Sequence, residues 1–267
     1  METLKEHAYR AKKILSNKET GYSINKNNII SIFKYTNNIK GYSKDSIIIQ
    51  LTILDSYYST QMNKRYYGIE DLANSIWSIA NTKEDFNYNI LSFLNNPLDN
   101  DKIYNLFNTN YGIHKNGEDA GKAISLISKY AYYQTEYRYP IYDSLVKKVF
   151  PLIIEKYYKY DNDFPVVNNF KGDNSPMNEY INFNNNIKML NEKSDINNFD
   201  ILDNLLWLSG KFSKNNYSLV LNKDDYFNTI KDKYDAKSKQ IIIEDIDSLE
   251  LSKDIKEIMR FVRYIKS

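Results

Sequence analysis

The sequence predicts a mainly α-helical protein of 267 residues. Glycine (8) and proline (5) are scarce, so few positions favour the frequent tight turns of β-barrels and β-sandwiches. Apolar residues recur at helical spacing along most of the chain, which is typical of amphipathic helices. Hydrophobic residues make up 42% and charged residues 26% of the chain, as in globular domains that bury a core.

The first part of the chain predicts successive helices separated by short connections. Ser43 and Asp45 are suited to cap the run IIIQLTILDSYY, and Asp99 is suited to cap the run around Ile103. The predicted helices lie near 2–16, 24–37, 44–60, 68–80, 85–94, 100–109, 119–133 and 143–159.

The second part predicts a different organisation. Residues 161–198 are polar and indicate a long connection with one helix, near 177–190. The apolar run ILDNLLWLSGK predicts a helix that ends at Gly210, because glycine commonly occupies the C′ position. Beyond it we expect a small α+β appendage, in which 218–221 pairs with 241–243, and a last helix from Ser252. The predicted division is a helical domain over 1–212 and an appendage over 213–267.

Composition excludes several classes of site. Without cysteine there is no thiolate nucleophile and no cysteine-ligated metal or iron–sulfur cluster. With only His7 and His114, a histidine metal cage is not expected, and no cofactor is predicted. No apolar run reaches the ~20 residues of a membrane span, so we expect a cytoplasmic protein. The net charge is +2, but residues 1–160 carry +5, which weakly favours a nucleic-acid partner.

Two stretches of the sequence carry residues suited to chemistry on DNA. SLISKYAYYQTEYRYPIYDSLV places Lys129 in one helical run and Asp143 at the head of the next, 14 residues later. An amine whose pKa is lowered by apolar surroundings can act as a nucleophile, and a carboxylate at a helix start stays ionised. A polar turn around Tyr58 and Gln61 ends an earlier helix.

These residues resemble motifs of the helix-hairpin-helix (HhH-GPD) DNA glycosylase superfamily, over residues 40–211. IIQLTILDSYYSTQMNK resembles the family helix whose polar end presses against the lesion strand. ISKYAYY resembles the second hairpin helix, which carries a nucleophilic lysine, and YPIYDSLV resembles the segment that presents the essential aspartate. Together with LLWLSGK, the pattern resembles a divergent 8-oxoguanine DNA glycosylase-like branch.

The resemblance implies a two-lobed helical domain that flips a damaged or modified base out of double-stranded DNA and excises it, with abasic-site (AP) lyase activity. Lys129 would form the Schiff base, and Asp143 would be the electrostatic stabiliser or base. Tyr58 would be the wedge that fills the gap in the duplex, with Gln61 or Asn63 against the orphaned base. The other DNA contacts implied are Ser59, Thr60, Lys64, Arg65, Lys115, Lys122, Ser128 and Arg138. A monomer is expected, in repair or in defence against phage.

Each of these residues also has a structural interpretation. Taken alone, Lys129 is more simply an exposed lysine on an amphipathic helix, and Asp143 an N-cap, which does not exclude catalysis. Trp77 and Trp207 lie among apolar residues at helical spacing, which favours core packing over base stacking. The hairpin lacks the family's LPGVG-type turn, with Gly121 as the nearest glycine. The alternative function is therefore a noncatalytic helical protein that binds DNA or another protein on the same scaffold.

Overall fold

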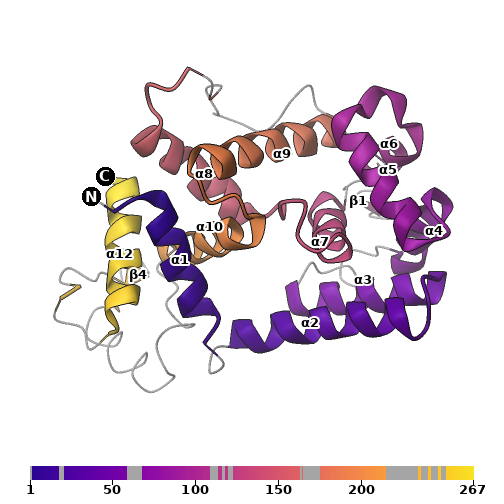
Figure 1. Cartoon of the computed structure of the whole chain (residues 1–267), viewed down its shortest axis with the longest axis horizontal. Coiled ribbons are helices and arrows are strands. Elements are labelled where there is room, and N and C mark those ends of the chain that lie inside the picture. Colours follow the sequence, from indigo (N-terminus) through magenta and orange to yellow (C-terminus); the bar gives the residue numbers. More distant parts are fainter. Residues whose placement is uncertain are drawn as a thin grey trace. The chain divides into compact units, whose positions relative to one another are not determined.

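The protein is mainly helical, as the sequence predicts (Figure 1). The computed structural model describes residues 2–17, 21–58, 68–108, 114–115, 118–119, 123–162, 164, 175–214, 234–235, 240–241, 246–247 and 251–267. The helices are α1 (Leu4–Leu15), α2 (Gly21–Asn38), α3 (Lys44–Tyr58), α4 (Ile69–Ile79), α5 (Lys83–Asn95), η2 (Pro97–Asp99, a 3₁₀ helix), α6 (Asp101–Asn108), α7 (Ile124–Gln134), α8 (Ser144–Tyr157), α9 (Pro176–Lys193), α10 (Phe199–Ser213) and α12 (Lys253–Lys266). None of the helices in this part of the chain combines the length and apolar character of a membrane span.

The described residues also contain two short antiparallel strand pairs. β1 (His114–Lys115) pairs with β2 (Glu118–Asp119), and β3 (Tyr234–Asp235) pairs with β4 (Gln240–Ile241). The helix expected over 119–133 therefore begins later, at Ile124, because Asp119 belongs to a strand. Ile241 pairs with Tyr234. The expected partner strand, 218–221, lies outside the described residues.

Side-chain caps define several helix starts. Thr3 and Glu6 form a capping box at α1, in which each side chain accepts from the other's backbone amide. Ser43 caps α3 as predicted, with Oγ 3.2 Å from the amide nitrogen of the third helical residue. The cap predicted at Asp99 is wrong: Asn100 accepts from an amide in the first turn of α6, at 3.3 Å. Asp99 is taken up by the 3₁₀ turn, which moves the cap one residue along the chain.

The chain forms two compact units. Unit 1 contains Met1–Ile24, Asp143–Asn168 and Met189–Ser267, and unit 2 contains Asn25–Tyr142 and Asn169–Lys188. This division differs from the predicted boundary after residue 212. The reason lies in the last helix: α12 packs against α1 and α10 inside unit 1, so it shares their core.

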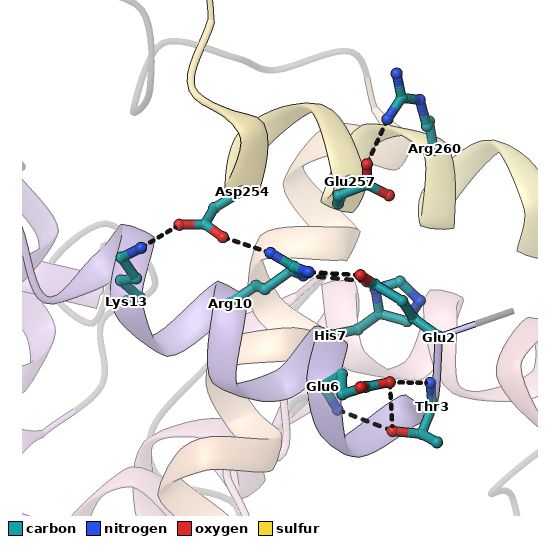
Figure 2. Close-up of polar contacts among 9 residues, drawn as sticks. All are labelled: Glu2, Thr3, Glu6, His7, Arg10, Lys13, Asp254, Glu257 and Arg260. Atoms are coloured by element: carbon teal, nitrogen blue, oxygen red, sulfur yellow. Dashed lines mark hydrogen bonds and ion pairs between the residues drawn. The ribbon is translucent and has the colours of Figure 1, made fainter.

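Charged side chains join α1 to α12 in unit 1 (Figure 2). The Arg10 guanidinium donates to both carboxylate oxygens of Glu2 and, at 2.6 Å, to Asp254 of α12. Lys13 pairs with the second oxygen of Asp254, also at 2.6 Å. Arg10 lowers the pKa of the Glu2 carboxyl, and Lys13 with Arg10 lowers the pKa of Asp254. The first and last helices are thus held together by ion pairs as well as by apolar packing.

His7 lies beside this cluster, on the buried side of α1 (Figure 2). Its ring packs on Phe261 of α12 with the ring centroids 4.5 Å apart, and only 5% of the residue is exposed. Burial lowers the pKa of His7, and this outweighs the opposing effect of the Glu2 carboxylate, 3.5 Å from Nδ1. The imidazole is therefore neutral in the folded chain at neutral pH.

We expect acid to destabilise unit 1 through His7. A histidine in the unfolded chain takes up a proton near pH ~6.5, whereas folded His7 does so only at lower pH. Its contribution to stability is therefore present above about pH 6.5 and is lost as the pH falls from there towards the lowered pKa. The charged groups around it are Glu2, Glu6, Arg10 and Glu257.

Urea midpoints at about pH 7.5 and about pH 5 measure this effect. The urea midpoint of the wild type should be lower at about pH 5 than at about pH 7.5. His7→Phe keeps a ring against Phe261 but cannot bind a proton, so its midpoint should fall less. Equal falls in the two proteins would contradict the prediction. Glu2 and Asp254 do not mimic the effect, because carboxyls with lowered pKa values titrate below this window.

Gly210 lies inside α10, so the prediction that the helix ends there is wrong. α10 continues to Ser213, because its last turn remains in the core with Phe212 1% exposed. A Cβ atom built at Gly210 would lie 2.5 Å from Cβ of Leu145 and 3.2 Å from the Leu145 carbonyl carbon. The glycine therefore serves close packing of α10 on α8, and not helix termination.

Gly210→Ala should lower the free energy of unfolding, because overpacking a core usually costs about 1–3 kcal/mol. The higher helix propensity of alanine offsets up to ~1 kcal/mol of this cost. The strain arises because the new methyl group meets the backbone of α8, which cannot rotate away. Urea denaturation measures the change. Gly68→Ala is the matched control, because the three atoms nearest to its methyl group would all belong to the Asp71 side chain and not to backbone. If Gly210→Ala lowers the free energy of unfolding no more than Gly68→Ala does, α8 and α10 have room to adjust.

Aromatic side chains fill much of the core of unit 2. Phe86 meets the fully buried Tyr130 edge to face, with ring centroids 5.2 Å apart. Phe107 stacks on Phe93 and on Tyr180, at 5.1 and 4.7 Å. These contacts join α5 to α7 through Phe86 and Tyr130, and join α5, α6 and α9 through Phe107.

Each of the two tryptophans packs against a tyrosine of its own unit. Trp77 lies 5.9 Å from Tyr42, and Trp207 lies 4.5 Å from Tyr22, measured between ring centroids. Both tryptophans are half-buried. Their apolar surface therefore contributes to packing within the units.

Candidate active site around Lys129

Lys129 lies in the most buried helix of unit 2. Residues Leu126–Gln134 of α7 are all buried, and Lys129 itself is only 1% exposed. Lysine is almost never fully buried unless its ammonium group has partners. The interpretation of Lys129 as an exposed surface lysine is therefore wrong.

The Lys129 ammonium is held on α7 and covered by a tyrosine ring. Nζ donates to Oγ of Ser125 at 2.5 Å and to the Ser125 carbonyl oxygen at 3.3 Å, one helical turn earlier. Nζ also lies 5.0 Å from the ring centroid of Tyr58, within the range of a cation–π interaction. The serine and the aromatic face compensate part of the cost of removing this charge from water.

Tyr58 is the last residue of α3 and is half-buried. Its hydroxyl group is 2.8 Å from the hydroxyl of Tyr133 on α7, and the two ring centroids are 6.4 Å apart. The wedge proposed from the sequence is therefore the same side chain that covers the proposed nucleophile.

Asp143 caps α8, as the structural interpretation of the sequence predicted. Its backbone is extended (φ −126°, ψ 146°), and Oδ1 accepts from the Leu145 amide at 2.7 Å. The side chain is half-buried. Lys129 belongs to unit 2 and Asp143 to unit 1, so each is described in its own unit, and their pairing in one site stays a prediction.

Ser128, predicted to contact DNA, is 0% exposed, and its hydroxyl group serves the main chain. Oγ donates to the carbonyl oxygen of Ser125 at 3.0 Å and accepts from the Tyr142 amide at 3.0 Å. The second bond ties α7 to the segment that precedes Asp143. A buried hydroxyl engaged in this way is a structural tie, so the DNA contact is corrected to this role.

Glu179 of α9 is a polar partner that the sequence did not predict. The Tyr142 hydroxyl group donates to its carboxylate, and the Tyr142 ring meets Phe183 edge to face at 5.1 Å. Burial raises the pKa of Glu179. Tyr142 is thus fixed at its amide by Ser128, at its ring by Phe183 and at its hydroxyl by Glu179.

The other predicted DNA contacts are only partly described. Arg138 is exposed and follows Glu136 and Tyr137, whose φ angles of 55° and 70° lie in the left-handed region. Lys115 belongs to β1 and pairs with Glu118 of β2 through the backbone. The remaining predicted contacts lie outside the described residues: Ser59, Thr60, Gln61, Asn63, Lys64, Arg65 and Lys122.

The described residues offer no clustered metal ligands, since no group of three or more Asp, Glu or His side chains is placed to hold an ion. An open hollow of about 820 Å³ lies along Glu155–Asn162 at the end of α8, and Lys129 does not line it. With Lys129 1% exposed, any substrate would have to displace a side chain to reach its amine.

Comparison with protein-family models, curated proteins and solved structures found no match to this chain.

Proposed function

We propose that the protein is a DNA glycosylase with AP-lyase activity, which flips and excises a damaged or modified base. Lys129 is the nucleophile, and Asp143 stabilises positive charge that develops at C1′ of the sugar. The observation that carries the proposal is the burial of Lys129 under an aromatic ring. Burying an ammonium costs free energy, whereas an apolar side chain at this position of the core would cost none.

The proposed reaction needs no group beyond the protein, the DNA and water. The Lys129 ammonium first loses a proton to water. Its neutral nitrogen then bonds to C1′ while the bond from C1′ to the base breaks, and the base leaves with that electron pair and takes a proton. Opening of the sugar ring converts the adduct to an imine, the Schiff base. Loss of a proton from C2′ then expels the 3′ phosphate and cleaves the strand. An anion beside C1′ lowers the barrier by offsetting the developing positive charge.

The tie between Ser128 and Tyr142 fixes the segment of unit 2 that leads into Asp143. Ser128 precedes Lys129 and Tyr142 precedes Asp143 in the chain, and the two preceding residues share a hydrogen bond of 3.0 Å. Glu179 and Phe183 hold the same tyrosine. The chain reaches Asp143 from an anchored residue, as positioning of a catalytic group requires.

The contacts of Lys129 also favour a second function, a noncatalytic helical protein that binds DNA or another protein. An ammonium held by Ser125 and covered by Tyr58 can serve the fold alone. The two functions differ in whether the amine ever forms a bond to a sugar.

Borohydride trapping separates them. The full chain is incubated with a duplex that contains one abasic site, in the presence of borohydride, which reduces an imine to a stable amine. The glycosylase should yield a covalent protein–DNA complex, and the undamaged duplex should yield none. Measurable binding to the abasic duplex without any trapped complex would reject the enzyme. A panel of duplexes with different modified bases then identifies the base that is released.

A further inference from the structure

Tyr58 is placed to control access to Lys129. Its ring lies over the ammonium with 5.0 Å between Nζ and the ring centroid, and Lys129 is only 1% exposed. Ser125 holds the same ammonium through its hydroxyl and carbonyl oxygens. Ser125 of α7 and Tyr58 at the end of α3 therefore both contact the amine.

Tyr58 is itself fastened to α7. Its hydroxyl group is 2.8 Å from the Tyr133 hydroxyl, and this hydrogen bond helps to keep the ring over the lysine. Tyr133 is 6% exposed and packs against Phe33 at 5.5 Å between centroids, which makes it a firm anchor. Tyr58, by contrast, is half-buried at the end of its helix, so its side chain is the movable partner of the pair.

We infer that Tyr58 is an access-controlling residue of the proposed reaction, whose displacement uncovers the Lys129 amine. The inference rests on the proposed function and deepens it. A ring that enters the gap in a duplex cannot at the same time cover Nζ or keep its bond to Tyr133. Filling the gap left by a flipped base and exposing the nucleophile are then one movement. The amine reacts only when DNA has engaged the wedge, which keeps it from other carbonyl compounds.

The test measures the reactivity of Lys129 without any DNA. The full chain is treated with sulfosuccinimidyl acetate, and acetylation of each lysine is followed over time by peptide mass spectrometry. Lys13 is the internal reference, because 76% of its side chain is exposed. In the wild type, Lys129 should react at least about tenfold more slowly than Lys13, since it reacts only when its cover opens.

Variants of the cover should raise this rate. Tyr58→Ala should increase acetylation of Lys129 about tenfold, because it removes the aromatic face. Tyr58→Phe and Tyr133→Phe keep both rings and remove the hydroxyl bond, so each should increase the rate about two- to tenfold. Tyr57→Ala is the matched control: Tyr57 is the adjacent half-buried tyrosine, and its hydroxyl accepts from Asn28.

Two results would overturn the inference. One is acetylation of wild-type Lys129 as fast as Lys13, and the other is a Tyr58→Ala rate no higher than that of Tyr57→Ala. If Tyr58→Ala does not fold, the two phenylalanine variants decide the question, because they change one hydroxyl group each. The two hypotheses fail in different ways. Absence of a trapped complex on abasic DNA rejects the glycosylase. A trapped complex, combined with acetylation of Lys129 that does not depend on Tyr58, rejects only the role of Tyr58 in controlling access.

Discussion

Lys129→Gln is expected to abolish both base release and borohydride trapping. Glutamine retains a polar side chain that can still donate to Ser125, but its amide nitrogen is not a nucleophile and cannot form an imine. The expected loss extends to the detection limit of a gel assay, because no other group in the proposed reaction supplies the attacking electron pair. Base release from the modified-base duplex and trapping on the abasic duplex are measured on the same preparation.

Lys26→Gln is the matched control for this change. Lys26 also belongs to unit 2 and also lies over tyrosine rings, 5.8 Å from the centroid of Tyr132 and 5.3 Å from that of Tyr137. Its Nζ donates to the Tyr132 hydroxyl group at 3.3 Å. Removal of this amine should leave trapping intact. Strand cleavage at the wild-type rate in Lys129→Gln would show that another lysine is the nucleophile, and Lys122 would be tested next.

Asp143→Asn is expected to slow base release by about 10²–10³-fold while the stability of the protein hardly changes. Asparagine is as good an N-cap as aspartate, so the bond from the Leu145 amide, 2.7 Å in the wild type, can persist. The substitution removes the negative charge that offsets the developing cation at C1′. Single-turnover rates and urea midpoints, measured together, separate the charge from the cap.

Asp143→Ala completes this comparison. Alanine removes cap and charge alike, so it should slow the reaction as much as asparagine and also destabilise the protein by about 1 kcal/mol. A rate for Asp143→Asn within a few-fold of the wild type would show that Asp143 is a cap and has no further role. Full activity of Asp143→Asn together with reduced activity and stability of Asp143→Ala would support the same conclusion.

Much of the helical structure could be predicted because it depends on neighbours in the chain. The spacing of apolar residues indicates which runs are helical, and a serine or aspartate before such a run satisfies the free amides of its first turn. Ser43 at α3 and Asp143 at α8 were both predicted as caps and are confirmed. Where two candidates adjoin, the local pattern does not discriminate, and Asn100 displaced Asp99 because a 3₁₀ turn intervened.

The candidate site could be predicted only in part. The spacing of Lys129 and Asp143 from neighbouring apolar residues indicated a partly apolar setting for the lysine and a helix start for the aspartate. It did not indicate that Ser128 ties Tyr142, 14 residues away, or that Glu179 receives the Tyr142 hydroxyl from 37 residues away. Such partners leave no periodic signal, because Tyr142 lies between α7 and α8 while Ser128 and Glu179 lie on α7 and α9.

By itself, the sequence therefore determined the mainly helical class, the positions of most helices and the cap at Asp143, since each follows from contacts within a few residues. Tertiary structure alone decided that Gly210 is a packing residue of α10 against α8, that α12 shares a core with α1, and that Tyr58 covers Lys129. The physical reason is the range of the interactions. A helix can be read from its own turns, whereas burial and pairing depend on which distant surfaces the folded core brings into contact.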